Sequence, residues 1–336
     1  MPRDHLIKTW IAENLPNVEK FEPASSDASF RRFFRLFLSN GTTQILMDIP
    51  PEKESAAAFL KVAHILNAGN IAAPKILKTD EKNGILIVSD LGRIVYLEAL
   101  KAAPESADHL MQAACSVLID FQKISRAGVL PPYSHTLLMN EMQLFIDWFL
   151  KRHLNFALSE TEEAALKNVF HFLSNAALNQ PKVFVHRDFM PRNLMLPEQG
   201  DAIAPALIDF QDAVYGPITY DVVSLFRDAF ISWEEEQELD WVIRYWEKAR
   251  AANLPVRADF ARFWQEYEWM GLQRHLKVLG IFCRLNYRDG KTHYIADLPR
   301  FLNYALKVAG RYAELSPLLQ ILKKLEQTPE KTAFTF

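Results

Sequence analysis

Three oxygen-bearing side chains stand at fixed spacing within one stretch of the sequence, residues 184–212. Asp188 and Asn193 fit the pattern H-x-D-x-x-x-x-N, and Asp209 follows in the segment L-I-D-F-Q-D. In-line transfer of a phosphoryl group from ATP needs an acceptor for the proton of the attacking hydroxyl, and oxygen ligands for the Mg²⁺ that bridges the phosphates. The stretch therefore predicts Asp188 as the proton acceptor, and Asn193 and Asp209 as the Mg²⁺ ligands.

Short apolar segments flank these residues and predict the strands that position them. Residues 183–185, 194–196 and 206–208 form three apolar runs, which indicate short buried strands. The second and third runs would form a hairpin-like return, with Asn193 at one end and Asp209 at the other. A polar loop that merely carries turn residues would explain one of the three groups, but not all three at these positions.

The pattern resembles the catalytic loop and metal-binding aspartate of protein kinases. It departs from them because Phe210 and Gln211, rather than Phe and Gly, follow the metal aspartate. With this variant the stretch is similar to the aminoglycoside phosphotransferase family of small-molecule kinases. The resemblance implies an α+β, two-lobed, protein-kinase-like fold that binds ATP and Mg²⁺. We expect an N-lobe over residues 1–90, with an antiparallel sheet and a helix, and a larger, mostly helical C-lobe over residues 91–336.

Neighbouring residues receive supporting roles. His186 is expected to orient the loop by hydrogen bonding, because the attacking hydroxyl already has a proton acceptor. Arg192 is a candidate for neutralising transferred charge, although a solvated arginine explains it nearly as well. The family resemblance makes Asp221 a brace for the catalytic loop; an acid in the first turn of a helix is the alternative. Asp212 either lies near the substrate or caps a turn.

The segment S-S-D-A-S-F-R-R-F-F-R joins a polar turn to a strand in which arginines and aromatic residues are interleaved. The implied fold places a phosphate-covering hairpin here, but no Gly-rich loop is present. Ser26, Ser29 and the backbone N–H groups around Asp27 are predicted to donate to phosphate, with charge from Arg31 or Arg32. The choice between the two arginines stays open, and an ordinary polar hairpin is the alternative.

The strand on which kinases usually carry the lysine that binds the phosphates contains no lysine in this sequence. That strand carries Met47 and Asp48 instead. The acid Glu54 lies at the start of the next helix, where it fits capping of the helix dipole. Either one of the two arginines or Lys53 replaces the lysine, or the protein does not transfer phosphate.

Residues 75–78 and 85–88 predict two more strands, and the segment S-D-L-G that follows breaks the pattern. In the implied fold this segment connects the lobes, and its backbone binds the adenine edge. We expect this contact over the residues from Ile87 to Ser89. Asp90 is expected to cap the next helix rather than to touch the ribose.

The last hundred residues are predicted to be helical and concentrate positive charge. The segment 271–291 contains one acid, Asp289, against a group of basic residues: Arg274, His275, Lys277, Arg284, Arg288 and Lys291. A kinase for polycationic aminoglycosides should gather carboxylates here, so the segment favours a substrate with a carboxylate or another anion. Arg274, Arg284 and Arg288 are the predicted substrate contacts. A solvated basic helix face explains the pattern equally well.

Three segments narrow the resemblance: S-D-A-S-F-R-R-F-F-R, M-D-I-P-P-E-K-E and K-V-L-G-I-F-C-R-L-x-x-R-D-G-K. They are similar to the amino-sugar kinases of this family that act in cell-wall recycling. The resemblance implies phosphorylation of N-acetylmuramate and N-acetylglucosamine at the anomeric hydroxyl, giving sugar 1-phosphates.

Other functions stay open. A kinase of another small alcohol, such as choline, homoserine or an aminoglycoside, is one alternative. The missing lysine also suggests a nucleotide-binding regulator without catalysis, and a scaffold protein is a third alternative. A protein without catalysis has no need to keep Asp188, Asn193 and Asp209 together, so the intact group favours an enzyme.

Bulk composition limits the partners. The 336 residues are 49% hydrophobic, enough for a large core in two domains or lobes, and the net charge of −3 provides no basic field for nucleic acid. The N-terminal residues mix charges into their apolar positions and lack the uninterrupted apolar core expected of a signal peptide, and no apolar run is long enough to span a membrane. Two cysteines, Cys115 and Cys283, favour a reducing cytoplasm. The expected partners are a sugar and ATP, with neither nucleic acid nor membrane, and the oligomeric state is left open.

Overall fold

The computed structural model describes residues 3–25, 31–197 and 203–326. The chain forms two compact units. Unit 1 comprises Met1–Val117 and Arg192–Asp212, and unit 2 comprises Leu118–Pro191 and Ala213–Phe336. Each unit is therefore built from two separate segments of the chain. The sequence predicted a single boundary, between residues 90 and 91, which would make each lobe one continuous segment. That boundary stays a prediction.

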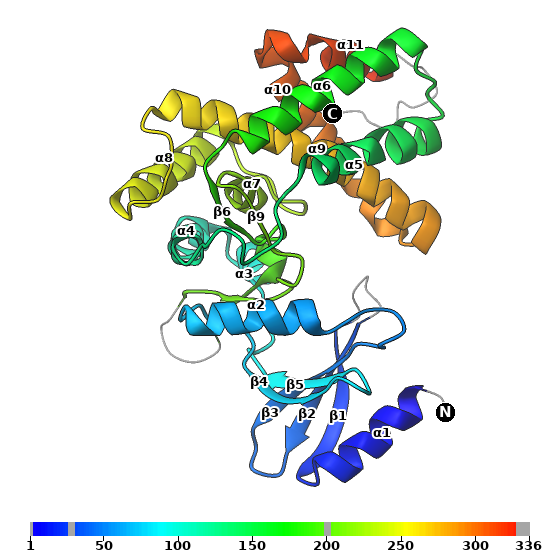
Figure 1. The fold of residues 1–336 in the computed structure, drawn as a ribbon, viewed down its shortest axis with the longest axis vertical. Coiled ribbons are helices and arrows are strands. Elements are labelled where there is room, and N and C mark those ends of the chain that lie inside the picture. Colours follow the sequence, from blue (N-terminus) through cyan, green and yellow to red (C-terminus); the bar gives the residue numbers. More distant parts are fainter. Residues whose placement is uncertain (1–2, 26–30, 198–202, 327–336) are drawn as a thin grey trace. The chain divides into compact units, whose positions relative to one another are not determined.

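Unit 1 contains a five-stranded antiparallel sheet with the strand order β1-β2-β3-β5-β4. The strands are β1 (Val18–Ser25), β2 (Arg32–Leu38), β3 (Thr43–Asp48), β4 (Ile76–Asp80) and β5 (Ile85–Ser89). Two helices, α1 (Arg3–Asn14) and α2 (Ala57–Ala68), lie on different sides of this sheet (Figure 1). The antiparallel sheet and helix expected in this part of the chain are confirmed.

The two faces of the sheet have different neighbours, because successive side chains of a strand alternate between its faces. One face packs against α1 in a buried apolar cluster: Ile7, Trp10, Ile11, Leu36, Leu38, Leu46, Ile85 and Ile87. The opposite face carries Phe33, Met47 and Val88, which line a cavity together with Phe59 of α2. The register of β2 and β3 therefore decides which polar residues reach the cavity.

The rest of unit 1 supports a short hairpin. Strand β7 (Leu194–Met195) pairs with β8 (Ala206–Leu207), as the apolar runs predicted. The N–H of Leu207 donates to the carbonyl of Ala72 at 2.7 Å, and that of Leu196 donates to Ile94 at 2.8 Å. These bonds fix the hairpin to the segments around the sheet. The helices of this region are α3 (Tyr96–Ala102), the short 3₁₀ helices η1 (Pro104–Ser106) and η3 (Pro191–Asn193), and α4 (Ala107–Lys123), which ends in unit 2.

Unit 2 is mostly helical, as expected. Its strands β6 (Lys182–Val185) and β9 (Val214–Pro217) pair antiparallel. Its helices are α5 (His135–Leu144), the π-helix η2 (Phe145–His153), α6 (Glu160–Leu178), α7 (Tyr220–Phe226), α8 (Glu235–Ala251), α9 (Phe260–Asp289), the 3₁₀ helices η4 (Thr292–Asp297) and η5 (Ala313–Leu315), α10 (Leu298–Arg311) and α11 (Ser316–Glu326).

The long helix α9 runs through the core of unit 2, and α5, η2, α6, α10 and α11 contribute to the same buried cluster (Figure 1). Gly280 allows α9 to pack closely against the backbone at Leu144, because a Cβ at this position would lie 2.3 Å from the carbonyl carbon of Leu144. The helix ends at Gly290, whose φ of 71° places it in the left-handed region that glycine adopts at little cost.

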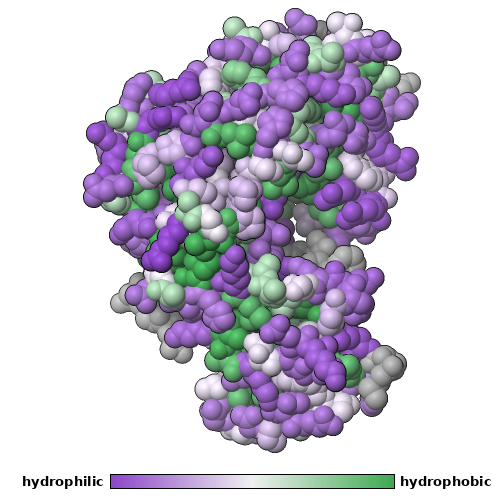
Figure 2. Space-filling model, viewed as in Figure 1, coloured by the Kyte–Doolittle hydropathy of each residue, from purple (hydrophilic) through white to green (hydrophobic). Residues whose placement is uncertain are grey.

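The side chains on the visible face are mostly hydrophilic (Figure 2). Within the described ranges, no helix is both long enough and apolar enough to cross a membrane.

Candidate active site

The β7–β8 hairpin brings Asn193 and Asp209 close together. Leu194 pairs with Leu207, and the N–H of Ile208 donates to the carbonyl of Asn193 at 3.1 Å. Both predicted metal ligands line the same cavity. Asp209 has a φ of 63°, an uncommon conformation for a residue other than glycine, and one that occurs often at functional sites. The hairpin thus presents an amide and a carboxylate at one place, as the sequence predicted.

The cavity lies within unit 1 and has a volume of about 460 Å³, within the range of small-molecule sites. Apolar side chains from the sheet and α2 form one part of its wall: Phe33, Ile45, Met47, Phe59 and Val88. Polar residues form another part: Arg31, Arg35, Ser89, Arg192, Asn193, Asp209 and Gln211. An apolar wall beside cations and oxygen-bearing side chains suits a ligand with a planar aromatic ring and a charged group attached to it.

Arg31 reaches the cavity and is held by an acid. Its Nε donates to Oε2 of Glu54 at 3.0 Å, its Nη2 bonds Oε1 of the same carboxylate, and its Nη1 lies 3.9 Å from Oδ1 of Asp209. Gln211 donates to the same Asp209 oxygen at 2.9 Å. Glu54 lies two residues before Ala56, the N-cap of α2, and binds Arg31, a partner that the sequence did not reveal.

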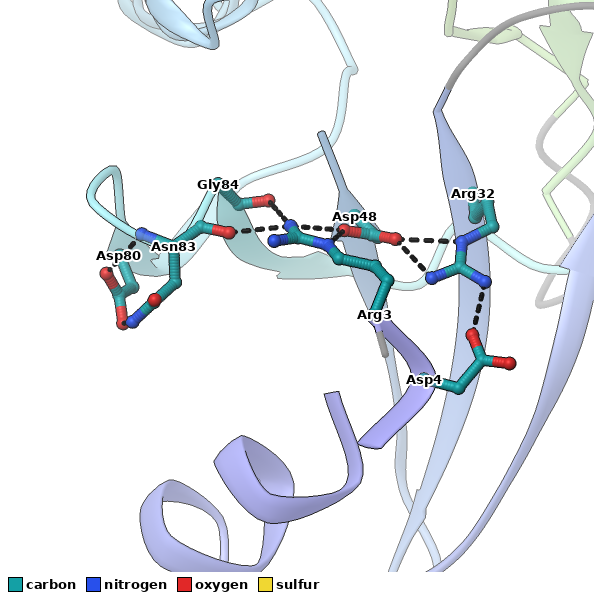
Figure 3. A network of polar contacts seen from close by, with 7 residues as sticks. All are labelled: Arg3, Asp4, Arg32, Asp48, Asp80, Asn83 and Gly84. Carbon is teal, nitrogen blue, oxygen red and sulfur yellow. Dashed lines mark hydrogen bonds and ion pairs between the residues drawn. The ribbon is translucent and has the colours of Figure 1, made fainter. Parts of the chain in front are cut away.

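Arg32 points to the other face of the sheet (Figure 3). It pairs with Asp48 at 2.8 Å and with Asp4, and Asp48 also accepts from Nε of Arg3 at 2.7 Å. Asp48 is fully buried, so the two arginines compensate a charge that would otherwise be costly. Arg32 does not line the cavity. The open choice between the two arginines is therefore resolved in favour of Arg31 as the residue near the cavity.

The segment after β5 is fixed by an arginine that sequence reasoning missed. Arg35 binds Asp90 through two nitrogens, at 2.6 and 3.1 Å, and donates to the carbonyl of Gly92 at 2.7 Å. Asp90 also accepts from the N–H of Gly92. The N-cap of α3 is Val95, so the prediction that Asp90 caps that helix is wrong. Its carboxylate shapes the connector instead.

The remaining residues predicted to bind nucleotide fall into two groups. Ser89 lines the cavity, whereas the Ile87 side chain packs in the cluster against α1; the predicted backbone contact with adenine stays a prediction. Ser26, Asp27 and Ser29 lie outside the described residues.

Unit 2 contains the loop that carries Asp188. Strand β6 ends at Val185, and the buried carboxylate of Asp221 accepts the N–H groups of His186 at 2.6 Å and Arg187 at 3.0 Å. The backbone N–H of Asp188 donates to Nδ1 of His186 at 3.3 Å. These are the contacts of a brace and of an orienting residue. Arg187 has a φ of 75°, which turns the chain sharply before Asp188.

Burial dominates the electrostatics of Asp221. Desolvation raises the pKa of Asp221 to about 7, and the nearby charge of Asp188 adds to the rise. The N–H donors of His186 and Arg187, and the charge of Arg274, act in the opposite direction. The net result is a raised pKa for a buried carboxyl group beside the loop that carries Asp188.

A buried cluster around Glu141 was missed by sequence reasoning. Glu141 accepts from Tyr133 at 2.5 Å, Gln273 at 3.1 Å and Arg187 at 2.5 Å, and pairs with Lys277 at 3.1 Å. The two cations lower the pKa of Glu141 against the effect of burial. In the sequence, Glu141 is only the single acid of the α5 segment; its burial, at 6% exposed, comes from the structure.

The basic residues of α9 separate into different environments. Arg274 is buried and donates to the carbonyl of Arg227, and His275 is fully buried. Arg284 is half-buried, and Arg288 is exposed and pairs with Asp289 at 2.8 Å. Burial and the neighbouring charge of Arg288 lower the pKa of Arg284. Asp212 is exposed.

The structure therefore gathers the predicted residues into two groups. Asn193, Asp209, Arg31, Arg192 and Ser89 line one cavity in unit 1. His186, Asp188 and Asp221 meet in unit 2.

Comparison with known proteins defines the class. The model of the phosphotransferase enzyme family matches residues 20–260, and the chain belongs to this family. Solved structures share its fold. The choline kinase LicA from Streptococcus pneumoniae has a TM-score of 0.63 at 14% identity, covering 90% of this chain and 99% of that chain. The ADP-bound aminoglycoside phosphotransferase APH(2'')-Ib has a TM-score of 0.59 at 13% identity, covering 90% and 98%. The protein-kinase-like fold is confirmed.

Particular relatives are much more similar in sequence. The N-acetylmuramate/N-acetylglucosamine kinase of Neisseria meningitidis serogroup B is 46% identical over 340 residues, covering all of both chains. The kinase of the same name from Pseudomonas aeruginosa is 46% identical, covering 97% of this chain and 95% of the relative. The family and subgroup suggested by the three sequence segments are confirmed.

Proposed function

We propose that this protein is an ATP-dependent kinase that phosphorylates the anomeric hydroxyl of N-acetylmuramate and N-acetylglucosamine in the cytoplasm, giving sugar 1-phosphates for cell-wall recycling. The observation that carries the proposal is the 46% identity, over the full length, to a kinase that bears the names of both sugars. The cavity of unit 1 and the braced loop of unit 2 support the reaction type.

The cavity of unit 1 is the proposed nucleotide site. Its apolar wall, which includes Phe33 and Met47, suits the base, and the backbone near Ser89 suits the adenine edge. The phosphates would extend toward Arg31 and Arg192, whose charges balance theirs. Ser26, Asp27 and Ser29 remain the proposed phosphate donors of the preceding turn.

Asn193 and Asp209 are the residues that would hold Mg²⁺. Amide and carboxylate oxygens are suitable ligands for this hard ion, which also binds phosphate oxygens and water. Two protein side chains leave coordination positions open for phosphate oxygens and water, so the site fits an ion that binds together with the nucleotide. When bound, Mg²⁺ would neutralise charge on the phosphates.

Asp188 accepts the proton of the attacking hydroxyl in this proposal. The hydrogen bond to His186 and the brace from Asp221 fix its backbone. An anomeric hydroxyl is more acidic than an ordinary alcohol, so little basicity is required of Asp188. Positioning and charge neutralisation then supply most of the rate enhancement.

Helix α9 is proposed to contact the sugar. Arg284 and Arg288 are four residues apart and so share one helix face. These cations suit the lactyl carboxylate of N-acetylmuramate. Arg274 is buried against the carbonyl of Arg227, so the proposed carboxylate contact rests on Arg284 and Arg288, with Asp212 as a candidate for the sugar hydroxyls.

A panel of acceptors tests the proposal. The purified protein is incubated with labelled ATP and Mg²⁺ and with N-acetylmuramate, N-acetylglucosamine, choline, homoserine or kanamycin, and the phosphate position is determined by NMR. We expect turnover of the two amino sugars and a phosphate on the anomeric carbon. Turnover of choline without the amino sugars would reject the proposed substrate.

A second measurement separates an enzyme from a regulator without catalysis. Asp188→Asn should abolish turnover and leave ATP affinity nearly unchanged, because this residue is proposed to act on the acceptor and not on the nucleotide. Unchanged turnover in the variant would contradict the assigned role of Asp188.

A further inference from the structure

The cavity face of strand β3 carries no basic residue. Ile45 and Met47 line the cavity, and Asp48 lies on the opposite face with Arg3 and Arg32. In protein kinases this strand provides a lysine that pairs with a glutamate of the following helix and binds the phosphates. The position that would hold that lysine is thus filled by apolar side chains.

Arg31 and Glu54 form a pair on the same side of the sheet. The Arg31 side chain is 8% exposed and bonds both oxygens of Glu54 through Nε and Nη2. This arrangement directs Nη1 toward Asp209, at 3.9 Å. We infer that the Arg31–Glu54 pair replaces the lysine–glutamate pair: Arg31 binds the phosphates of the nucleotide, and Glu54 is the positioning residue that aims it. The inference rests on the proposed kinase function.

The geometry of the guanidinium supports this assignment. Two parallel hydrogen bonds to one carboxylate fix the plane of an arginine guanidinium. A lysine ammonium is not planar, so a carboxylate cannot fix its direction in this way. Glu54 therefore determines both the place and the direction of Nη1. Because Asp209 is also a proposed ligand of the nucleotide-bound ion, Arg31 lies where phosphate oxygens and metal ligand would meet.

Arg93 and Arg192 also line the cavity, and Arg192 is the second cation proposed to face the phosphates. Three further cations in this part of the chain have other positions or partners. Arg35 is bound by Asp90 and shapes the connector, and Arg32 is bound by Asp48 and Asp4 on the other face. Lys53 is exposed and does not line the cavity. Arg31 combines burial, a direction fixed by Glu54 and proximity to Asp209.

Calorimetry with two ligands tests the inference on the full-length protein. Adenosine and Mg²⁺–ADP share the base and ribose, and only ADP has phosphates. Arg31→Ala should weaken ADP binding by about 10- to 100-fold and leave adenosine binding unchanged, because a charge-assisted bond to phosphate contributes roughly 1.5–3 kcal/mol. Arg31→Lys keeps the positive charge and loses the planar guanidinium, so it should weaken ADP binding less than Arg31→Ala does.

A double-mutant cycle tests the positioning role of Glu54. Glu54→Gln alone should weaken ADP binding several-fold, and it should have no further effect in the Arg31→Ala background, because it acts through Arg31. In the wild-type background it should raise KM for ATP and leave KM for the sugar unchanged. Lys53→Gln is the matched control, a neighbouring cation outside the cavity, and should bind ADP normally.

The outcomes separate the two proposals. If the wild-type protein binds neither adenosine nor ADP, the proposed kinase function fails. If it binds both and Arg31→Ala binds ADP normally, or loses adenosine equally, the inference about Arg31 is overturned while the kinase function stands. Additive effects of the Arg31 and Glu54 substitutions would reject the positioning role of Glu54.

Discussion

Asp221 accepts the backbone N–H of His186 at 2.6 Å, through a carboxylate that is 1% exposed. Its other oxygen accepts the N–H of Arg187. A carboxylate far along the chain therefore fixes the two residues immediately before Asp188. This contact connects the fold of unit 2 to the geometry of the proposed catalytic group.

Replacing Asp221 should impair catalysis more than binding. Asp221→Asn keeps the shape of the side chain and turns one accepting oxygen into an N–H donor that faces a backbone N–H. We expect kcat to fall about 10- to 100-fold, since a lost charge-assisted hydrogen bond contributes roughly 1.5–3 kcal/mol, with little change in KM for ATP. Steady-state kinetics check this. Asp240→Asn, at an exposed acid of α8, should behave like the wild type.

The same residue should make stability depend on pH. Burial raises the pKa of Asp221 to about 7 in the folded protein, against about 3.9 in the unfolded chain. The folded state thus retains a proton that the unfolded state releases. This contribution to stability is fully present below about pH 4 and is lost as pH rises through about 7.

Urea unfolding at pH 5 and pH 8 measures this effect. The wild type should lose about 2 to 3 kcal/mol more than Asp221→Asn between these pH values, because the asparagine does not titrate. Equal losses in both proteins would show that Asp221 is ionised throughout this range.

Removing the charge of Glu141 should destabilise unit 2. Glu141→Gln leaves Arg187 and Lys277 buried without the carboxylate that pairs them, and loss of one partner from a buried pair costs about 3–5 kcal/mol. Chemical denaturation measures this. Glu163→Gln removes an acid that pairs with Lys167 on the surface and should cost less than about 1 kcal/mol. Similar losses in both variants would contradict the importance of burial.

Two glycines on helices provide a matched test of packing. A Cβ at Gly280 would overlap the backbone of Leu144, whereas one at Gly310 has nothing within 4 Å. Gly280→Ala should destabilise the protein by about 1–3 kcal/mol because α9 must move away from the residues around Leu144. Gly310→Ala should stabilise it by about 0.5–1 kcal/mol through helix propensity. Thermal unfolding of both variants distinguishes crowding from propensity.

The proposed carboxylate contact predicts a difference between the two sugars. Arg284→Gln should raise KM for N-acetylmuramate about 10-fold and leave KM for N-acetylglucosamine unchanged, because only the former has a lactyl carboxylate. Parallel kinetics with both sugars measure this. An equal rise for both would assign Arg284 to the shared part of the sugar or to stability.

Much of the proposed site could be predicted because its chemistry is local in sequence. The H-x-D-x-x-x-x-N pattern and the aspartate after an apolar run identify Asp188, Asn193 and Asp209, and the β7–β8 pairing confirms that the last two lie together. Such spacing follows from a short hairpin, whose ends are close wherever the hairpin lies.

Contacts between distant segments were harder to predict. The acids Glu54, Asp90 and Glu141 were assigned to capping or not noticed, because a single acid in a sequence does not reveal its partner. The sequence did contain a signal about the orientation of Arg32: it lies two and four residues before the apolar Phe34 and Leu36. That alternation indicates a shared face, but the neighbours of each face come from elsewhere in the chain.

The sequence by itself determined the family, the short hairpin that carries Asn193 and Asp209, and the division into a sheet-containing first part and a mostly helical second part, because these depend on local spacing and hydrophobic pattern. The tertiary structure alone decided which arginine reaches the cavity, which acids hold Arg31, Arg35 and Arg187, and which cations of α9 are buried. These contacts depend on which face of a strand or helix packs against which neighbour. That packing is determined by segments far apart in the sequence, so local patterns do not reveal it.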